Sequence, residues 1–308
     1  MIRIGTRRSA LALAQASEVA NALRGQGEVV EIVPMRTEGD RLATVSLALV
    51  GGKGLFVREI DEALLAAHID VAVHSLKDLP AELPDGLCLA ALPLRADPRD
   101  VLLTRGAKSL GELAPGAVVG TSSPRRRALV LAARPDLTVV PLRGNVDTRL
   151  RSLESGACDA IVLAAAGLRR LGVTPAHVEM LDPEDFVPAV GQGIIAVEAR
   201  CDDAPTLAAL AALDDRTTRV CAEAERAFLG RLGASCNSPL AAHATVTEGR
   251  VLGLTALVAS DDGRAVLRAR GEGPAAQAAA IGRALADTLL ERGAAEVAPL
   301  RPVVGGTR

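Results

Sequence analysis

The sequence predicts an α/β protein with two sheet-and-helix domains followed by a small α+β domain. Short β-rich runs alternate with helical patterns from residue 1 to about residue 195. Prolines interrupt this alternation in residues 92–100, where we place a hinge between two domains. From residue 217 the pattern changes to a helix, three β-rich runs and a long Ala-rich helix. A chain of 308 residues also exceeds what a single hydrophobic core usually organises.

Five apolar runs lead into helices or loops and are predicted to be strands. Because a strand followed by a covering helix is typical of parallel sheets, we expect two small parallel sheets. The later run IIAVEAR (194–200) has no helix behind it and is expected to return to the first sheet. The five runs are IRIG (2–5), DVAVHS (70–75), AVVG (117–120), TVVPLRG (138–144) and DAIVLA (159–164).

These patterns give three expected domains. The first comprises residues 1–95 and 191–214, the second residues 99–188 and the third residues 217–308. In the third, a helix and a Gly/Ser/Cys/Asn/Pro loop precede strands joined by Glu-Gly and Asp-Asp-Gly turns, which predicts a three-stranded antiparallel sheet.

Composition favours a soluble globular enzyme, with 49% apolar and 23% charged residues. The absence of Trp and Tyr excludes aromatic platforms for single-stranded nucleic acid. A net charge of -2 gives no general attraction to nucleic acid or membranes. No export signal, long apolar run, disulfide framework or CxxC or HExxH pattern is apparent. We therefore expect a cytoplasmic protein without metal, nucleotide, nucleic-acid or membrane partners.

Arginines follow the predicted strands. All but three of the 35 basic residues are Arg, so surface arginines remain a reasonable alternative for any single position. Four groups, however, fall at the carboxyl ends of strands, where open α/β sheets bind ligands. This arrangement favours an anionic ligand. The groups are Arg7 with Arg8, Arg125 with Arg126, Arg143 with Arg149, and Arg169 with Arg170.

Arg125 and Arg126 directly follow a predicted helix cap at Ser123. Cations in a first helical turn oppose the helix dipole, which favours a functional reason for their position. Thr121, Ser122 and Ser123 supply hydroxyls and free backbone N–H groups to receive an anion, and the guanidinium groups are expected to hold carboxylates bidentately.

Asp78 ends the apolar strand in VHSLKDLP, where partial burial would tune a carboxylate for proton transfer or for pairing with a cation. A turn-capping role before Pro80 is the alternative. Lys77 is one of only three lysines in the chain, which suggests that this position requires the compact charge of an ammonium group. His74 is interpreted as a buried structural histidine.

Three further motifs were weighed. GGKG (51–54) lacks the P-loop spacing and is interpreted as the hinge of a mobile lid. GQGIIA (191–196) opens a strand and not a helix, so a dinucleotide site is rejected. Cys236 differs from the other cysteines because SCNSP is a loop, where a thiol can act as a nucleophile; no Cys-His-Asn arrangement is demonstrable.

Taken together, the motifs resemble the hydroxymethylbilane synthase (porphobilinogen deaminase) family in order and spacing. The resemblance runs from residue 2 to about residue 245, and the last 60 residues match only in pattern. The motifs are IGTRRSALALAQ, GGKGLFVREID, VAVHSLKDLP, GTSSPRRRA, LRGNVDTRL, LAAAGLRRLG, PAVGQG, AERAFL and SCNSP.

The resemblance implies a three-domain monomer whose first two domains are similar to type II periplasmic binding proteins. It implies a transferase of tetrapyrrole (heme and porphyrin) biosynthesis, which joins four porphobilinogens head to tail into hydroxymethylbilane with loss of ammonia. Cys236 matches the cysteine that carries a dipyrromethane cofactor. The product is expected to pass to the next tetrapyrrole enzyme.

The resemblance also implies roles for individual residues. Asp78 matches the catalytic aspartate, which assists loss of ammonia and stabilises the resulting azafulvenium cation. The lid corresponds to Gly51, Gly52 and Lys53. Leu49 stands where the family often has Lys, and Pro124 where Leu is frequent. The cofactor- and substrate-binding positions are Arg7, Ser9, Lys77, Thr121, Ser123, Arg125, Arg126, Arg143, Arg149 and Arg170.

Two other functions remain open from the residues alone. A non-catalytic anion-binding protein of the periplasmic-binding-protein class would account for the arginines without Asp78 or Cys236. A cysteine hydrolase would use Cys236 as its nucleophile.

Overall fold

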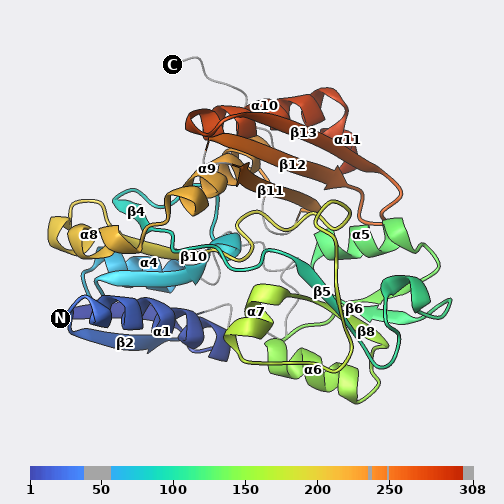
Figure 1. The fold of residues 1–308 in the computed structure, drawn as a ribbon, viewed down its shortest axis with the longest axis horizontal. Coiled ribbons are helices and arrows are strands. Elements are labelled where there is room, and N and C mark those ends of the chain that lie inside the picture. Colours follow the sequence, from blue (N-terminus) through green and yellow to red (C-terminus); the bar gives the residue numbers. More distant parts are fainter. Residues whose placement is uncertain (38–56, 235–237, 248–249, 301–308) are drawn as a thin grey trace.

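A computed structural model describes residues 1–37, 57–234, 238–247 and 250–300. Within these residues the chain forms two five-stranded sheets and one three-stranded sheet. Figure 1 shows the first two sheets side by side, with the C-terminal sheet lying over both. The predicted lid (51–54), Leu49 and Cys236 fall outside the described residues.

The first sheet has the order β2-β1-β3-β10-β4. β1, β2 and β3 are parallel, and β10 runs antiparallel to both β3 and β4. Its strands are β1 (Ile2–Arg7), β2 (Val30–Met35), β3 (Val71–Ser75), β4 (Leu87–Ala91) and β10 (Ile195–Arg200), with helices α1 (Ala10–Gly25), α4 (Arg58–Leu65) and α8 (Ala204–Leu210). The predicted return of residues 194–200 to this sheet is confirmed.

The second sheet repeats this arrangement in the order β7-β6-β8-β5-β9, with β5 antiparallel to its neighbours β8 and β9. Purely parallel sheets were therefore a wrong expectation, because each sheet takes in one reversed strand where the chain crosses between domains. The elements are β5 (Asp100–Thr104), β6 (Val118–Gly120), β7 (Thr138–Val140), β8 (Ala160–Ala164), β9 (Val178–Met180), α5 (Pro124–Ala133), α6 (Val146–Glu154) and α7 (Ala165–Arg170).

The two crossing segments, residues 92–99 and 188–194, lie against each other. The Ala96 N–H donates to the Gly193 carbonyl at 3.1 Å. Gly193 has a φ of +89°, and an added Cβ would lie 2.5 Å from the Ala96 carbonyl oxygen, so only glycine fits this close approach. The GQG motif thus lies in a segment that crosses between the domains and leads into the strand β10.

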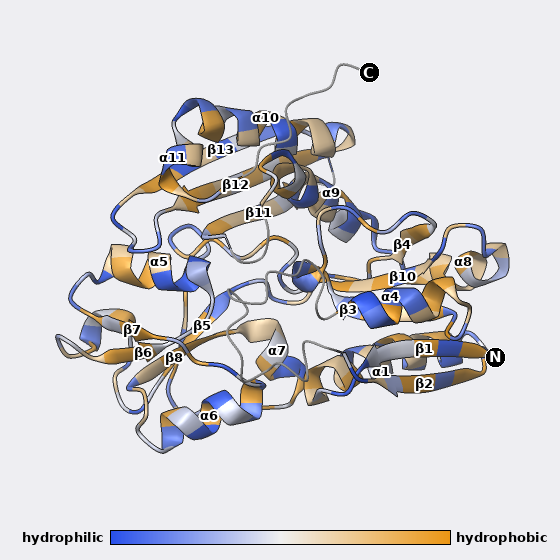
Figure 2. Cartoon of the chain, turned by 180° about the vertical axis from the view of Figure 1, so that it is seen from behind, coloured by the Kyte–Doolittle hydropathy of each residue, from blue (hydrophilic) through white to orange (hydrophobic). Residues whose placement is uncertain are grey.

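The C-terminal sheet is antiparallel, as predicted, with the order β11-β12-β13. One face packs on α9 and α10 around the fully buried Phe228, and residues of β11 and β12 also join the core beside α5. Figure 2 shows β12 largely hydrophobic, whereas α10 carries both polar and apolar segments. The elements are β11 (Leu240–Thr247), β12 (Val251–Ala259), β13 (Val266–Pro274), α9 (Arg216–Arg231), α10 (Ala278–Glu291) and α11 (Ala294–Val297).

The two five-stranded sheets and the small antiparallel third sheet confirm the expected fold class, α/β with a C-terminal α+β domain. Over the part of the chain that is described, no helix has the length and apolar character needed to cross a membrane.

Candidate active site

A cleft of about 880 Å³ lies where the three sheets meet, and side chains from all three domains line it. The helices α1, α5 and α6 begin at this cleft, each with a capping side chain whose oxygen accepts a backbone N–H: Ser9, Ser123 and Asn145. Helix N-termini carry partial positive charge, so the backbone itself favours an anion here. The cleft brings together Arg7, Ser9, Lys77, Asp78, Ser123, Arg125, Arg126, Arg143, Arg149 and Arg170.

Asp78 ends a short 3-10 turn (Leu76–Asp78) that follows β3. It is exposed to the cleft, so the expectation of partial burial was wrong. It also lines an adjoining recess of about 50 Å³ together with Arg7 and Ser9. Its carboxylate accepts no hydrogen bond from another described residue, which removes support for the turn-capping alternative. Asp78 is therefore a solvent-accessible carboxylate among cations.

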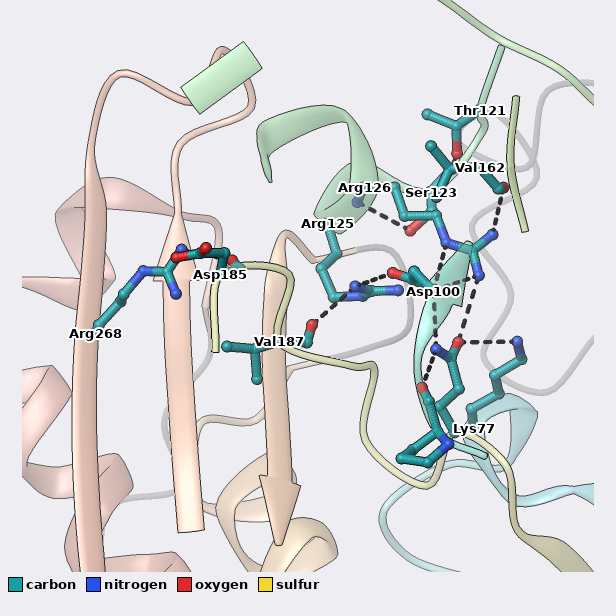
Figure 3. Close-up of polar contacts among 12 residues, drawn as sticks. Lys77, Asp100, Thr121, Ser123, Arg125, Arg126, Val162, Asp185, Val187 and Arg268 are labelled. Atoms are coloured by element: carbon teal, nitrogen blue, oxygen red, sulfur yellow. Dashed lines mark hydrogen bonds and ion pairs between the residues drawn. The ribbon is translucent and has the colours of Figure 1, made fainter. Parts of the chain in front are cut away.

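Arg125 and Arg126 are buried at the first turn of α5 and share a carboxylate, that of Asp100 at the start of β5. The distances are 2.7 Å from Arg125 Nη1 to Oδ2 and 2.9 Å from Arg126 Nη2 to Oδ1. Figure 3 shows both guanidinium groups turned toward this carboxylate. Arg125 also donates to the Val187 carbonyl and Arg126 to the Val162 carbonyl.

At the first turn of α5, which carries Arg125 and Arg126, the structure differs from the sequence-based expectation. Arg126 donates from both Nε and Nη2 to a single oxygen of Asp100, Oδ1, and the N–H groups of Thr121 and Ser123 already donate to the Val140 carbonyl and the Thr121 hydroxyl. Free N–H groups at those two positions were therefore a wrong expectation. Thr121 is buried and does not line the cleft.

The cluster of Asp100, Arg125 and Arg126 nevertheless carries a net positive charge. Burial raises the pKa of Asp100, but Arg125 and Arg126 outweigh this effect and hold it well below its usual value. One ionised carboxylate then faces two guanidinium groups, which leaves an excess of positive charge beside the cleft.

Gln192, fully buried in the GQG motif, connects this cluster to the turn that carries Asp78. Its side-chain nitrogen donates to Asp100 Oδ1 at 2.9 Å and to the Pro98 carbonyl at 2.7 Å, and its oxygen accepts from Lys77 Nζ at 3.3 Å. Burial and the nearby Arg126 lower the pKa of Lys77 to about 8. Lys77 is thus an ammonium group that readily changes charge beside Asp78.

The remaining cations line the cleft from the second domain. Arg149 donates to the Gly144 carbonyl at 3.0 Å, and burial followed by repulsion from Arg126 lowers its pKa to about 10. Arg170 bridges the two α/β domains, since its Nε lies 3.2 Å from Glu18 Oε1 in α1 and its Nη2 donates to the Gly193 carbonyl. Arg143 also lines the cleft.

The third domain reaches the cleft through Leu229, Ser238 and Leu240. Ser238 follows Cys236 by two residues in the sequence, and Cys236 itself lies outside the described residues. The described cysteines, Cys88, Cys158, Cys201 and Cys221, are free thiols, and none lines the cleft.

Sequence reasoning missed Asp100 and Gln192. Asp100 opens the otherwise apolar run DVLLT, and an acid at the start of a buried strand was the available signal. Nothing in the spacing of residues 78, 100, 126 and 192 indicates that they meet, because strand exchange between the domains brings them together.

The two α/β sheets thus share a cleft lined by arginines and a lysine, an arrangement suited to an anionic ligand. The family model "Porphobilinogen deaminase, dipyromethane cofactor binding domain" matches residues 2–208, and the model of the C-terminal domain of the same family matches residues 219–291. The chain belongs to the porphobilinogen deaminase family.

Curated relatives extend along nearly the whole chain. Porphobilinogen deaminase of Syntrophobacter fumaroxidans is 50% identical over 299 residues, 96% of either chain. That of Brevibacillus brevis is 49% identical over 302 residues, again 96% of each. The Roseiflexus protein of the same name is 51% identical and covers 94% of this chain and 96% of its own.

Among solved structures, a nutrient binding protein from Burkholderia cenocepacia bound to methionine is 15% identical, with a TM-score of 0.41, over 68% of this chain and 90% of its own. An ABC transporter periplasmic substrate-binding protein from Coxiella burnetii is 18% identical, with a TM-score of 0.40, over 69% and 91%. Likeness at these scores carries no argument, and the fold class rests on the strand orders.

Proposed function

We propose that this chain is a hydroxymethylbilane synthase, a transferase that joins four porphobilinogens head to tail and releases ammonia in tetrapyrrole biosynthesis. The observation that carries this proposal is that Lys77 and seven arginines line the same cleft as the exposed carboxylate of Asp78. Membership of the family supports it.

The cations match the charge of the substrate class. Porphobilinogen bears an acetate and a propionate, so each unit added to the chain brings two further carboxylates. Guanidinium groups hold carboxylates through paired, charge-assisted hydrogen bonds. Arg7 comes from the first domain, whereas Arg125, Arg126, Arg143, Arg149 and Arg170 come from the second, so a growing chain can be held from both sides.

Asp78 is proposed as the catalytic acid. Its carboxylate is exposed in the cleft and close enough to Lys77 and Arg149 to act on their charges, and it can stabilise the cationic azafulvenium that forms when ammonia leaves. A carboxyl group at this position can also take part in proton transfer to the departing amine. Lys77, whose own charge responds to pH near neutrality, adjusts the field at Asp78.

The residues of the cleft fit a dipyrromethane carried by Cys236. Ser238, two residues after Cys236 in the sequence, lines the cleft, Leu229 and Leu240 offer apolar contact for pyrrole rings, and the arginines offer partners for carboxylates. When bound, this group supplies the pyrrole carbon to which the first substrate unit is joined. Arg125, Arg126 and Arg149 would hold its acidic side chains.

Three finer statements belong to the same proposal. The chain divides into domain 1 (1–95 and 191–214), domain 2 (99–188) and domain 3 (217–308). It acts as a cytoplasmic monomer and passes its product to the next tetrapyrrole enzyme. The family resemblance also assigns a lid to Gly51, Gly52 and Lys53, which lie outside the described residues.

Intact-mass measurement of the purified protein tests the proposal together with porphobilinogen turnover. We expect a mass above that of the unmodified chain, an Ehrlich-positive reaction for pyrroles, and loss of both in Cys236→Ser. Cys221→Ser, which alters a buried thiol, is the matched control and should keep the modification.

The two alternatives give different outcomes in the same experiment. A non-catalytic anion-binding protein would show an unmodified mass and no release of ammonia. A cysteine hydrolase would show an alkylatable Cys236 and thiol-dependent cleavage of acyl substrates.

A further inference from the structure

A second cluster of ionisable residues lies away from the cleft, between α4 and the face of the first sheet that α4 covers. Asp61 comes from α4, His74 from β3 and Glu198 from β10. His74 pairs with Ala196 and Glu198 with Ala72 across the two strands, so both side chains emerge on one face of the sheet. Ile60 and Leu64 of α4 pack on this face beside Ala72.

All three side chains are buried. The side chains of His74 and Glu198 are 3% and 1% exposed, and Asp61 is 7% exposed. Four of their atoms accept or donate no hydrogen bond among the described residues: Asp61 Oδ1, His74 Nε2 and both carboxylate oxygens of Glu198. Each buried polar atom without a partner costs about 1–3 kcal/mol, so four in one place indicate a site built for a ligand.

The neighbouring cations do not supply that ligand. Arg226, whose charge acts on Glu198, uses its guanidinium to donate to the Pro80 and Ala81 carbonyls at 2.9 and 2.7 Å. Arg7, whose charge acts on His74, lines the cleft and the adjoining recess. Among the described residues, the two buried carboxylates therefore share no close positive partner.

The protonation of the cluster agrees with a site for a cation. Burial raises the pKa of Glu198 to about 8 and that of Asp61 to about 6, and burial lowers the pKa of His74 to about 4. His74 is thus neutral at physiological pH, the form in which imidazole binds metals. A bound cation would replace the protons that the carboxyl groups otherwise hold.

We propose that Asp61, His74 and Glu198 form a binding site for one divalent transition-metal cation. One ligand atom from each residue lies within 4.8 Å of the other two, and His74 Nε2 lies 3.6 Å from Glu198 Oε2. Metal–ligand distances of about 2.0–2.2 Å place neighbouring ligand atoms roughly 3–3.5 Å apart, so small side-chain rotations close the site.

The donor set indicates the class of cation. One imidazole with two carboxylates suits zinc or manganese, whereas magnesium and calcium prefer oxygen donors alone. His74 also lines the recess that adjoins the cleft, since Arg7, Ser9 and Asp78 line both. The bound cation would connect α4 to β3 and β10. Its ligand His74 lies four residues before Asp78 in the chain.

Binding of Mn²⁺ alone to the tag-free, EDTA-treated full-length protein tests this proposal, because Mn²⁺ has little affinity for the free thiols of the chain. We expect equilibrium dialysis to give one Mn²⁺ per chain, electron paramagnetic resonance to show the bound ion, and thermal unfolding to shift to higher temperature. Competition with Zn²⁺ should displace the manganese, since zinc binds N and O donors more tightly.

Matched variants locate the site. His74→Gln and Glu198→Gln should each weaken Mn²⁺ binding at least tenfold, while His68→Gln and Glu62→Gln, which alter exposed residues near α4, should leave it unchanged. The proposal is overturned if wild-type protein binds neither Mn²⁺ nor Zn²⁺ at millimolar concentration, or if binding survives in both site variants. The wild-type measurement decides the matter even if a variant fails to fold.

Discussion

Arg126 and Asp100 form a buried ion pair, with 2.9 Å between Nη2 and Oδ1 and no solvent exposure of the carboxylate. Arg125 completes the cluster by pairing with the other carboxylate oxygen of Asp100. The two arginines are thus held in place by a residue that the sequence did not single out. Their fixed orientation, beside helix N-termini that face the cleft, favours an anion at this edge of the second sheet.

Asp100→Asn should destabilise the protein by about 3–5 kcal/mol, because two buried guanidinium groups would lose their counter-charge. Urea-induced unfolding measures this change. Asp97→Asn removes a partly exposed pair with Arg99 and should cost about 1 kcal/mol or less. Equal stabilities of the two variants would show that the buried cluster does not hold the turn.

Asp78→Asn should retain the fold and the thermal stability of the parent, because Asp78 is exposed and bonded to no described residue. Its turnover of porphobilinogen should fall by about 100-fold or more, the usual contribution of an acid–base group. Steady-state assays check this, with Asp85→Asn, at an exposed acid, as the control. Near-normal turnover would move the acid role to another residue.

The pH dependence of kcat/KM should report Lys77. This ammonium is charged below its pKa of about 8 and neutral above it, so kcat/KM should decline as the pH rises through 8. In Lys77→Arg the side chain stays charged, and the decline should move to higher pH. Identical profiles for the two proteins would contradict a binding role for this charge.

Arg149→Met should raise KM about tenfold or more, because a charge-assisted hydrogen bond contributes about 1.5–3 kcal/mol. Arg151→Met is the matched control, since Arg151 is on the same helix but exposed and outside the cleft. Equal KM values for the two variants would show that Arg149 is an ordinary surface arginine and does not bind the substrate.

Glu225→Gln should unfold more easily than the parent at pH 7. The fully buried carboxylate accepts the N–H groups of Gly191 and Ala244 and pairs with Arg95 at 2.6 Å, which connects the crossing segments to the third domain. We expect a loss of about 3–5 kcal/mol in chemical denaturation, since Arg95 would lose its partner. Glu223→Gln, at an exposed position of the same helix, is the control.

The pKa of Glu225 also predicts how the free energy of unfolding changes at acid pH. Burial raises the pKa of Glu225, but Arg95 and His243 outweigh it and lower the pKa below its ordinary value of 4.5. The stabilisation is therefore present above pH 4.5 and is lost as the pH falls through the folded-state pKa. Unfolding free energies measured from pH 7 to pH 3 should converge for the parent and Glu225→Gln, and a constant gap would contradict this.

Much of the fold follows from local pattern. The strand ending at Gly120, the cap at Ser123 and the helix from Pro124 appear where the sequence predicts them, because caps and strand-to-helix boundaries depend on neighbouring residues. The reversed direction of β10 and β5 was not predictable in this way. Both strands lie where the chain crosses between domains, and their direction depends on which sheet edge the returning chain meets.

In the candidate site, too, some features follow from local sequence pattern and others depend on tertiary packing. Ten of the predicted binding and catalytic positions line one cleft because each follows a strand and therefore lies at the same edge of its sheet. Thr121 is the exception, since its side chain is used inside the turn. The exposure of Asp78 was also outside the reach of sequence pattern, because it depends on packing around the turn and not on the turn itself.

The sequence by itself determined the strand-to-helix units, the family and the positions of the cleft arginines, because these depend on periodicity, capping and residue order. Tertiary structure alone decided that Asp100 holds Arg125 and Arg126, that Gln192 joins Lys77 to them, and that Asp61, His74 and Glu198 meet between α4 and the sheet. Each of these groups draws on segments far apart in the chain. Their meeting depends on the exchange of strands between domains and on burial, which no local spacing records.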